Sequence, residues 1–334
     1  MLPDVISDPF GERSSRLTGK RLQLLGAAVH FASNSRALMR LVDTAYAGLP
    51  PHRLSSAART LRVNLLLGSG VGRFSRAEPP PVAMISGSGL LGGATDRSNF
   101  VVISPEARAA LVLVSPQMLR FPYQTRYELL EFAVFTLAAR AQQLVPLHGA
   151  CVGRDGRGVL LIGASGSGKS TVALHCLLDG FEFLSEDSVF VSPATMLATG
   201  VANFVHVRAD SLRWLGRDRA AAAIRKSPVI RRRSGVKKFE LDLRRDGFRL
   251  AKSPLKIVGA VILSPQSAGN RPLLTSISRS ALLSNLADTQ AYAASQPPWR
   301  EFSRNLSGLE AFELRRGRHP REAVDALRAF LAKR

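Results

Sequence analysis

The 334-residue chain has few cysteines, since Cys151 and Cys176 are the only two. They form no CxxC pair and no metal-ligand cluster, so we expect neither a disulfide framework nor a structural zinc site. This cysteine usage is typical of a protein in a reducing compartment. Aromatic residues are also scarce, at 7% of the chain, and no nucleic-acid-binding motif is recognisable. Nucleic acid is therefore not an expected partner.

Long hydrophobic runs are absent as well. No stretch reaches the roughly 18 consecutive apolar residues that a membrane-spanning helix requires. The first residues, MLPDVISDPFGERSSRL, mix acids and bases without a hydrophobic segment, unlike a signal peptide. The sequence thus predicts a cytoplasmic protein with no membrane span.

Acidic residues are outnumbered, with 25 Asp and Glu against 46 Lys and Arg and a formal net charge of +21. Such a balance favours anionic partners, among them a nucleotide, an acidic peptide, nucleic acid or a membrane surface. A high arginine content can also follow from genomic composition, so the net charge alone does not distinguish among these partners. Hydrophobic residues make up 46% of the chain, which is typical of a globular protein with room for two domains.

One segment carries a complete phosphate-binding motif. Residues 159–162 are apolar and predict a buried strand, and residues 163–170, GASGSGKS, match the pattern G-x-x-x-x-G-K-[ST]. A helix is expected over 169–178. Glycines let successive backbone N–H groups turn toward phosphate oxygens, and the N-terminal end of a helix favours negative charge. The segment therefore predicts a nucleotide-binding loop, and the alternative is a glycine-rich turn without a ligand.

The chemistry of this loop assigns roles to its residues. Lys169 is expected to reach the β- and γ-phosphates of ATP, and the hydroxyl of Ser170 to bind Mg²⁺. The expected cofactors are therefore ATP and Mg²⁺. The candidate nucleotide contacts are Gly163, Ala164, Ser165, Gly166, Ser167, Gly168, Lys169, Ser170 and Thr171.

Two adjacent carboxylates, Glu186 and Asp187, follow the predicted helix. Residues 181–191 are typical of a second strand, in which neighbouring side chains point to opposite faces. Asp187 lies only 18 positions after Lys169, so this strand would return an acid to the phosphates. The alternative is an exposed acidic pair at a strand end.

Together these features resemble the catalytic domain of HPr kinase/phosphorylase. That family has a strand, a G-x-S-G-x-G-K-S loop, a helix and a hydrophobic strand ending in an acidic pair, and it carries a His-Gly pair upstream, as His148-Gly149 does here. The resemblance is close over residues 145–195 and loose beyond them. It implies an α/β fold, with a P-loop kinase core of the HPr kinase/phosphoenolpyruvate carboxykinase type over 145–334 and an N-terminal α+β module over 1–144.

The resemblance also implies roles. Asp187 matches the general base, Glu186 its acidic neighbour at the metal, and His148 a histidine beside the phosphates. The implied activity is transfer of the γ-phosphoryl of ATP to a serine hydroxyl of a protein or peptide. The family's downstream Glu-Ile-Arg-Gly signature is absent from residues 200–208, GVANFVHVR, so the resemblance gives no support for the phosphorylase reaction or for HPr as the acceptor, and both stay open. Some relatives modify precursor peptides and many form oligomers, so a peptide acceptor and a homo-oligomer are compatible with it.

The densest basic stretch is 225–238, with seven Lys and Arg residues. A glycine-containing basic loop before a predicted strand, 238–243, suits closure over a triphosphate, because guanidinium groups bind phosphate through two hydrogen bonds. Arg233 and Lys237 are the predicted phosphate contacts within it. The alternative is a solvated charge run or a docking face for an acidic partner.

Hydrophobic periodicity predicts the other elements. The expected strands are 61–67, 100–103, 110–114, 203–208, 257–263 and 309–314, with a strand over 21–32 and a helix over 35–47 before them. The other expected helices are 124–143, 281–294 and 321–333. The glycine-rich stretch 86–93 lacks a lysine and a following helix, so it predicts a hairpin turn.

Two further functions stay open at this point. One is an ATPase in which Asp187 activates water instead of a hydroxyl. The other is a nucleotide-binding regulator without turnover, whose basic stretch is a docking surface.

Overall fold

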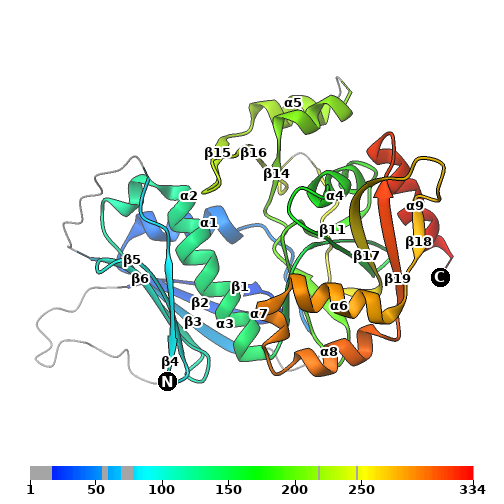
Figure 1. The fold of residues 1–334 in the computed structure, drawn as a ribbon. Helices are drawn as coiled ribbons and strands as arrows, with labels where there is room; N and C mark the ends of the chain where they lie inside the picture. Colours follow the sequence, from blue (N-terminus) through cyan, green and yellow to red (C-terminus); the bar gives the residue numbers. More distant parts are fainter. Residues whose placement is uncertain (1–16, 55–58, 69–77, 217–218, 246, 334) are drawn as a thin grey trace, which may run out of the picture. The chain divides into compact units, whose positions relative to one another are not determined.

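The computed structural model describes residues 17–54, 59–68, 78–216, 219–245 and 247–333, and it has a mixed α/β fold (Figure 1). The chain divides into two compact units. The first comprises Met1–Leu22, Ala28–Ala47 and Thr60–Leu137, and the second Gln23–Ala27, Gly48–Arg59 and Ala138–Arg334. The predicted boundary after residue 144, as a division between functional modules, stays a prediction. Within the described ranges, no helix has the length and apolar character to cross a membrane.

The first unit is built on a seven-stranded sheet in the order β1-β2-β3-β7-β6-β5-β4. The strands are β1 Thr18–Leu24, β2 Ala27–Ser33, β3 Thr60–Leu67, β4 Ala83–Gly87, β5 Leu90–Asp96, β6 Asn99–Ser104 and β7 Ala109–Val114. The helical segments are α1 Arg36–Tyr46, η1 Met118–Arg120, α2 Pro122–Gln124, η2 Thr125–Glu131 and α3 Phe132–Gln142, of which the residues from Ala138 on belong to the second unit. Strands β2, β3 and β7 pair in parallel, whereas β4 to β7 form an antiparallel meander.

Most elements predicted for this unit are confirmed, including the helix over 35–47 and the hairpin at 86–93. The predicted strand over 21–32 is wrong in one respect, because Leu25 and Gly26 adopt positive φ angles of 49° and 85° and make a turn between β1 and β2. The helix over 124–143 is present, but η2 within it is a π-helix. Periodicity does not distinguish that wider turn from an α-helix.

The second unit contains a nine-stranded sheet whose main path is β11-β9-β10-β17-β13-β12-β8. These strands are β8 Val145–His148, β9 Ala150–Arg154, β10 Arg157–Ile162, β11 Glu182–Ser185, β12 Ser188–Val191, β13 Leu197–Gly200 and β17 Leu255–Ser267, with β18 Leu274–Ser276 and β19 Glu310–Arg316 off the path. The helices around it are α4 Lys169–Leu178, α6 Arg279–Thr289, α7 Ala291–Ala294, α8 Trp299–Leu306 and α9 Pro320–Ala332.

Two hydrophobic cores lie on opposite faces of this sheet, because alternate residues of a strand point to opposite sides. In β10, Val159 and Leu161 pack into the core that contains α4 and α9. Leu160 and Ile162 pack into the core that contains α6 and α8. The predicted buried strand 159–162 is thus covered on both faces, which explains its uninterrupted apolar sequence.

The strand directions bring the phosphate-binding motif and the acidic pair to one edge. Strand β9 is antiparallel to both β10 and β11, so β10 and β11 run in the same direction and end at the same edge of the sheet. The predicted strand over 181–191 is wrong in its continuity, since it breaks into β11 and β12 with Glu186 and Asp187 between them. The carboxylates are therefore in a bend, at the carboxyl end of β11.

A three-stranded sheet, β14-β16-β15, completes the second unit. Its strands are β14 Phe204–Val207, β15 Val229–Arg231 and β16 Lys237–Asp242; the 3₁₀ helix η3 Ala209–Trp214 and the helix α5 Arg219–Lys226 lie between β14 and β15 in the chain. The basic stretch predicted as a loop is instead the end of α5 followed by the β15–β16 hairpin. The predicted helix over 281–294 is likewise divided into α6 and α7 at Gln290.

Candidate active site

The loop between β10 and α4 has the backbone that its glycines predict. Gly163, Gly166 and Gly168 have φ angles of 153°, 82° and 106°, which glycine adopts readily. A Cβ on Gly163 would come within 2.7 Å of the Ser167 hydroxyl oxygen and 2.9 Å of the Leu263 carbonyl oxygen. The first glycine is therefore required both by its backbone conformation and by close packing.

Two polar groups of this loop are suited to an anion. The ammonium group of Lys169 donates to the carbonyl oxygens of Gly163, at 2.6 Å, and Ala164, at 3.1 Å. Burial lowers the pKa of Lys169, although the charge of Asp187 partly offsets this. The buried hydroxyl of Ser167 has no hydrogen-bond partner among the residues that the structure describes. A phosphate would satisfy Ser167 and give Lys169 a charged acceptor.

The remaining predicted loop contacts lie at the start of α4 or on the surface. Ser170 and Thr171 are half-buried in the first turn of the helix, and the hydroxyl oxygen of Thr171 lies 3.4 Å from that of Ser211. Ala164, Ser165 and Gly166 are exposed. The exposed residues leave the outer side of the loop accessible to a ligand.

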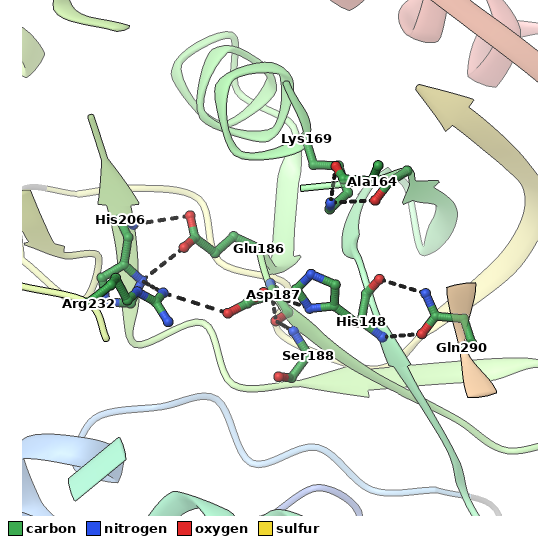
Figure 2. Close-up of polar contacts among 11 residues, drawn as sticks. His148, Ala164, Lys169, Glu186, Asp187, Ser188, His206, Arg232 and Gln290 are labelled. Atoms are coloured by element: carbon green, nitrogen blue, oxygen red, sulfur yellow. Dashed lines mark hydrogen bonds and ion pairs between the residues drawn. The ribbon is translucent and has the colours of Figure 1, made fainter. Parts of the chain in front are cut away.

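Asp187 lies against His148, as Figure 2 shows. Strands β8 and β12 are antiparallel, and Ser188 pairs with His148, so the residue before Ser188 meets the histidine. The Nδ1 of His148 is 2.9 Å from Oδ1 of Asp187, and their side chains are 58% and 29% exposed. A solvent-accessible, hydrogen-bonded pair of this kind can move or hold a proton.

The charge around Asp187 keeps it ionised. Burial alone would raise the pKa of Asp187, but the hydrogen bond and charge of His148, followed by the charge of Arg232, outweigh burial and hold this pKa well below its usual range. One guanidinium nitrogen of Arg232 lies 3.7 Å from Oδ2 of Asp187. The carboxylate is thus negatively charged at neutral pH.

A buried glutamine fixes the backbone of His148. The backbone N–H of His148 donates to the Oε1 of Gln290 at 2.8 Å, and the Nε2 of Gln290 donates to the carbonyl oxygen of His148 at 3.1 Å (Figure 2). Gln290 is 6% exposed and lies at the break between α6 and α7. Both backbone groups of the histidine are therefore held by one side chain that is 142 positions away in the sequence.

Glu186 points into a buried network. Its Oε2 accepts from the backbone N–H of His206 at 3.0 Å, and its Oε1 lies 2.9 Å from Nδ1 of the same histidine. The Nε2 of His206 lies 3.2 Å from Oε1 of Glu240. Burial lowers the pKa of His206, but hydrogen bonds to Glu186 and Glu240 outweigh it and raise this pKa. With both oxygens engaged, Glu186 faces His206, and its metal-binding role stays a prediction.

The basic hairpin contributes residues other than the two predicted. Arg233 and Lys237 are exposed, whereas Arg232 reaches Asp187, and Lys238 is close enough to Glu186 and Asp187 for their charges to affect its pKa. The sequence shows seven similar cations in this stretch. Only the pairing of β15 with β16 around the turn at 232–235 decides which of them face the acidic pair.

The described residues include no group of three or more His, Cys, Asp or Glu side chains that could hold a metal ion. This does not conflict with Mg²⁺ as a cofactor, since Mg²⁺ is commonly bound through one or two protein oxygens together with substrate phosphates. Of the two predicted ligands, Ser170 lies half-buried at the start of α4, whereas both carboxylate oxygens of Glu186 contact His206.

No family model matches the chain, and no curated protein matches it. Among solved structures, the Hpr(Ser) kinase/phosphatase from Coxiella burnetii is similar with 12% identity and a TM-score of 0.28, over 56% of this chain and 88% of that one. A likeness at this level supports no argument about activity or site residues.

Proposed function

We propose that this protein is an ATP- and Mg²⁺-dependent kinase that transfers the γ-phosphoryl group of ATP to a serine hydroxyl of a protein or peptide. The observation that carries the proposal is the meeting of two features at one sheet edge. One is the glycine loop with Lys169 and an unsatisfied Ser167 hydroxyl. The other is the ionised Asp187, hydrogen-bonded to His148 and close enough to Lys169 to influence its pKa.

In this proposal the loop and α4 hold the phosphates. The N–H groups of the loop and the first turn of α4 point toward the γ-phosphoryl, and Lys169 exchanges its carbonyl acceptors for phosphate oxygens. Ser170 would hold Mg²⁺ together with phosphate oxygens, and the ion would neutralise phosphate charge. Phosphoryl transfer depends chiefly on positioning and charge stabilisation, so this small set of groups is sufficient.

The acceptor hydroxyl would give its proton to Asp187 as its oxygen bonds to the γ-phosphorus, while the bond from that phosphorus to the β,γ-bridging oxygen breaks and ADP leaves. While Arg232 and His148 are both beside it, the low pKa of Asp187 makes this carboxylate a weak base. A triphosphate is a stronger attraction for a guanidinium than a single carboxylate. Movement of Arg232 onto the nucleotide would therefore raise the basicity of Asp187 when substrate is bound, and His148 would keep the carboxylate oriented.

Transfer of label from γ-labelled ATP tests the function. Purified protein with Mg²⁺ and host lysate or synthetic serine peptides should give a labelled polypeptide, and Lys169→Ala should abolish the labelling. Labelled free phosphate alone, again lost in Lys169→Ala, would identify an ATPase. Nucleotide binding without either product, whatever the acceptor, would contradict the proposal and favour the regulator.

Gln290→Ala is expected to lower kcat about 10- to 100-fold with little change in the KM for ATP, because a small displacement of a catalytic group is enough for such a loss. The variant leaves the backbone N–H and carbonyl of His148 without their partner, which should also cost about 1–3 kcal/mol of stability. Steady-state kinetics and thermal unfolding would measure the two effects. The exposed Gln266→Ala is the matched control, and equal kinetics in both variants would show that Gln290 does not position His148.

A further inference from the structure

The β15–β16 hairpin and the end of α5 present a strongly basic surface. Residues 219–239 contain eight Lys and Arg residues and no Asp or Glu. We call the five exposed cations at the end of α5 and in the hairpin the hairpin patch: Arg225, Lys226, Arg231, Arg233 and Lys237. Helix α5 contacts β16, and two residues separate its end from β15, so the end of the helix lies next to the hairpin in the chain.

The pairing of this hairpin is unfavourable for the fold by itself. Arg231 lies directly opposite Lys237 on the neighbouring antiparallel strand. Like charges at such a position destabilise a sheet, because their side chains lie side by side on the same face. Val229, next but one to Arg231 on that face, is 57% exposed. One face of the hairpin thus presents two cations and an apolar side chain to solvent.

The cations of the hairpin fall into two groups, one facing the acidic pair and one exposed to solvent. Arg232 and Lys238 face the acidic pair at the active site. Arg231, Arg233 and Lys237, their immediate neighbours, are exposed. Since an arginine side chain spans only two or three residues of extended chain, the patch begins within reach of a peptide whose serine is at Asp187.

We propose that the hairpin patch binds an acidic segment of the peptide acceptor and so presents its serine to Asp187. This inference rests on the proposed kinase function and names the class of its substrate. The acceptor is a serine peptide with Asp or Glu residues about three to five positions from the serine, since Arg231 and Arg233 flank Arg232, which reaches Asp187, and extended chain spans about 3.3 Å per residue. Arginine side chains bind carboxylates through two hydrogen bonds, which gives the patch selectivity for such a segment.

The composition of the segment favours a peptide over a nucleic acid. Single-stranded nucleic acids are bound by basic grooves that also supply aromatic rings on which the bases stack. Residues 219–239 contain one aromatic residue, Phe239, and it packs against the hydrophobic core. The patch therefore offers charge and one exposed valine, but no stacking surface.

The test compares three matched serine peptides, in which the positions three to five residues from the serine are all Glu, all Ala or all Lys. The variant Arg225→Ser/Lys226→Ser/Arg231→Ser removes three patch charges outside the nucleotide site. Its control, Arg279→Ser/Arg300→Ser/Arg304→Ser, removes three exposed charges from α6 and α8. The readouts are kcat/KM for phosphoryl transfer and, independently, fluorescence anisotropy of labelled peptides with a non-hydrolysable ATP analogue.

Wild type should prefer the Glu peptide over the Ala peptide by about tenfold or more in kcat/KM and in affinity. The patch variant should lose this preference and keep the KM for ATP, whereas the control variant should retain both. High salt should reduce the preference because the contacts are exposed. Equal use of the Glu and Ala peptides, or equal losses in the patch and control variants, would overturn the inference while leaving the kinase intact.

The binding measurement separates this inference from the proposed function. If wild type binds the Glu peptide selectively through the patch and transfers no label, the docking surface stands and the kinase proposal fails. If a labelled single-stranded oligonucleotide binds through the patch and the Glu peptide does not, the surface is for nucleic acid and the inference is wrong. A competition experiment, in which the Glu peptide and the oligonucleotide are added together to wild type, shows which of the two occupies the patch.

Discussion

Asp187→Asn should lower kcat for phosphoryl transfer about 10²- to 10⁴-fold, the usual contribution of a general base. Asparagine keeps the size of the side chain but removes the negative charge that faces His148 and Arg232. The nucleotide contacts of the loop are unchanged, so the KM for ATP should change little. Rates of label transfer at saturating ATP would measure the effect.

The matched control for this variant is Asp155→Asn, in the turn between β9 and β10. Asp155 is exposed and has a φ of 52°, a conformation that asparagine tolerates, so its substitution should leave the rate unchanged. Wild-type transfer by Asp187→Asn would show that Asp187 is not the base. A loss of ATP binding in that variant would instead assign Asp187 mainly to the nucleotide and its metal.

His206→Ala is expected to destabilise the second unit by about 3–5 kcal/mol, because it leaves the buried carboxylates of Glu186 and Glu240 without the imidazole that both contact. The melting temperature should fall by about 10 °C. Thermal unfolding followed by circular dichroism would measure the loss. His30→Ala, an exposed histidine on β2, is the control and should change the melting temperature little. A loss below about 1 kcal/mol would mean that the carboxylates find other partners.

The same histidine should make stability depend on pH. Because the folded pKa of His206 is raised, its contribution is fully present below the unfolded pKa, about 6.5, and is lost as pH rises through the folded value. Burial lowers the pKa of His52, so that residue acts in the opposite direction. The difference in melting temperature between wild type and His206→Ala isolates His206, and it should be larger at pH 6 than at pH 9. A constant difference would show that His206 carries no extra proton in the folded state.

The local sequence was sufficient to predict helices and strands whose hydrophobic pattern is uninterrupted. The strand before the glycine loop, the loop and α4 are adjacent in the chain, so residue order alone predicts their arrangement. The short separation of Lys169 from Asp187 likewise indicated that an acid returns to the loop, and the structure places Asp187 within electrostatic reach of Lys169. Periodicity did not predict the break at Glu186 and Asp187, because strand-like residues 181–184 and 189–191 lie on both sides of it, although the resemblance implied a strand that ends in an acidic pair.

The sequence did not predict which side chains point toward the acidic pair. Among similar arginines in the basic stretch, Arg232 faces Asp187 because the strands β15 and β16 pair around the turn that contains it. His206 and Gln290 reach the acidic pair and His148 from strands and helices far along the chain. No local pattern distinguishes such residues, since their roles depend on which segments pack together.

The sequence by itself determined the strand, glycine-rich loop and helix that contain Lys169, because glycine conformations and the following helix are encoded by neighbouring residues. It also determined a basic, cysteine-poor chain with room for two domains. Only the tertiary structure decided that Asp187 meets His148, that Glu186 turns to His206, and which cations of the hairpin face inward. The physical reason is that local geometry follows from adjacent residues, whereas these contacts depend on strand pairing and burial between distant segments.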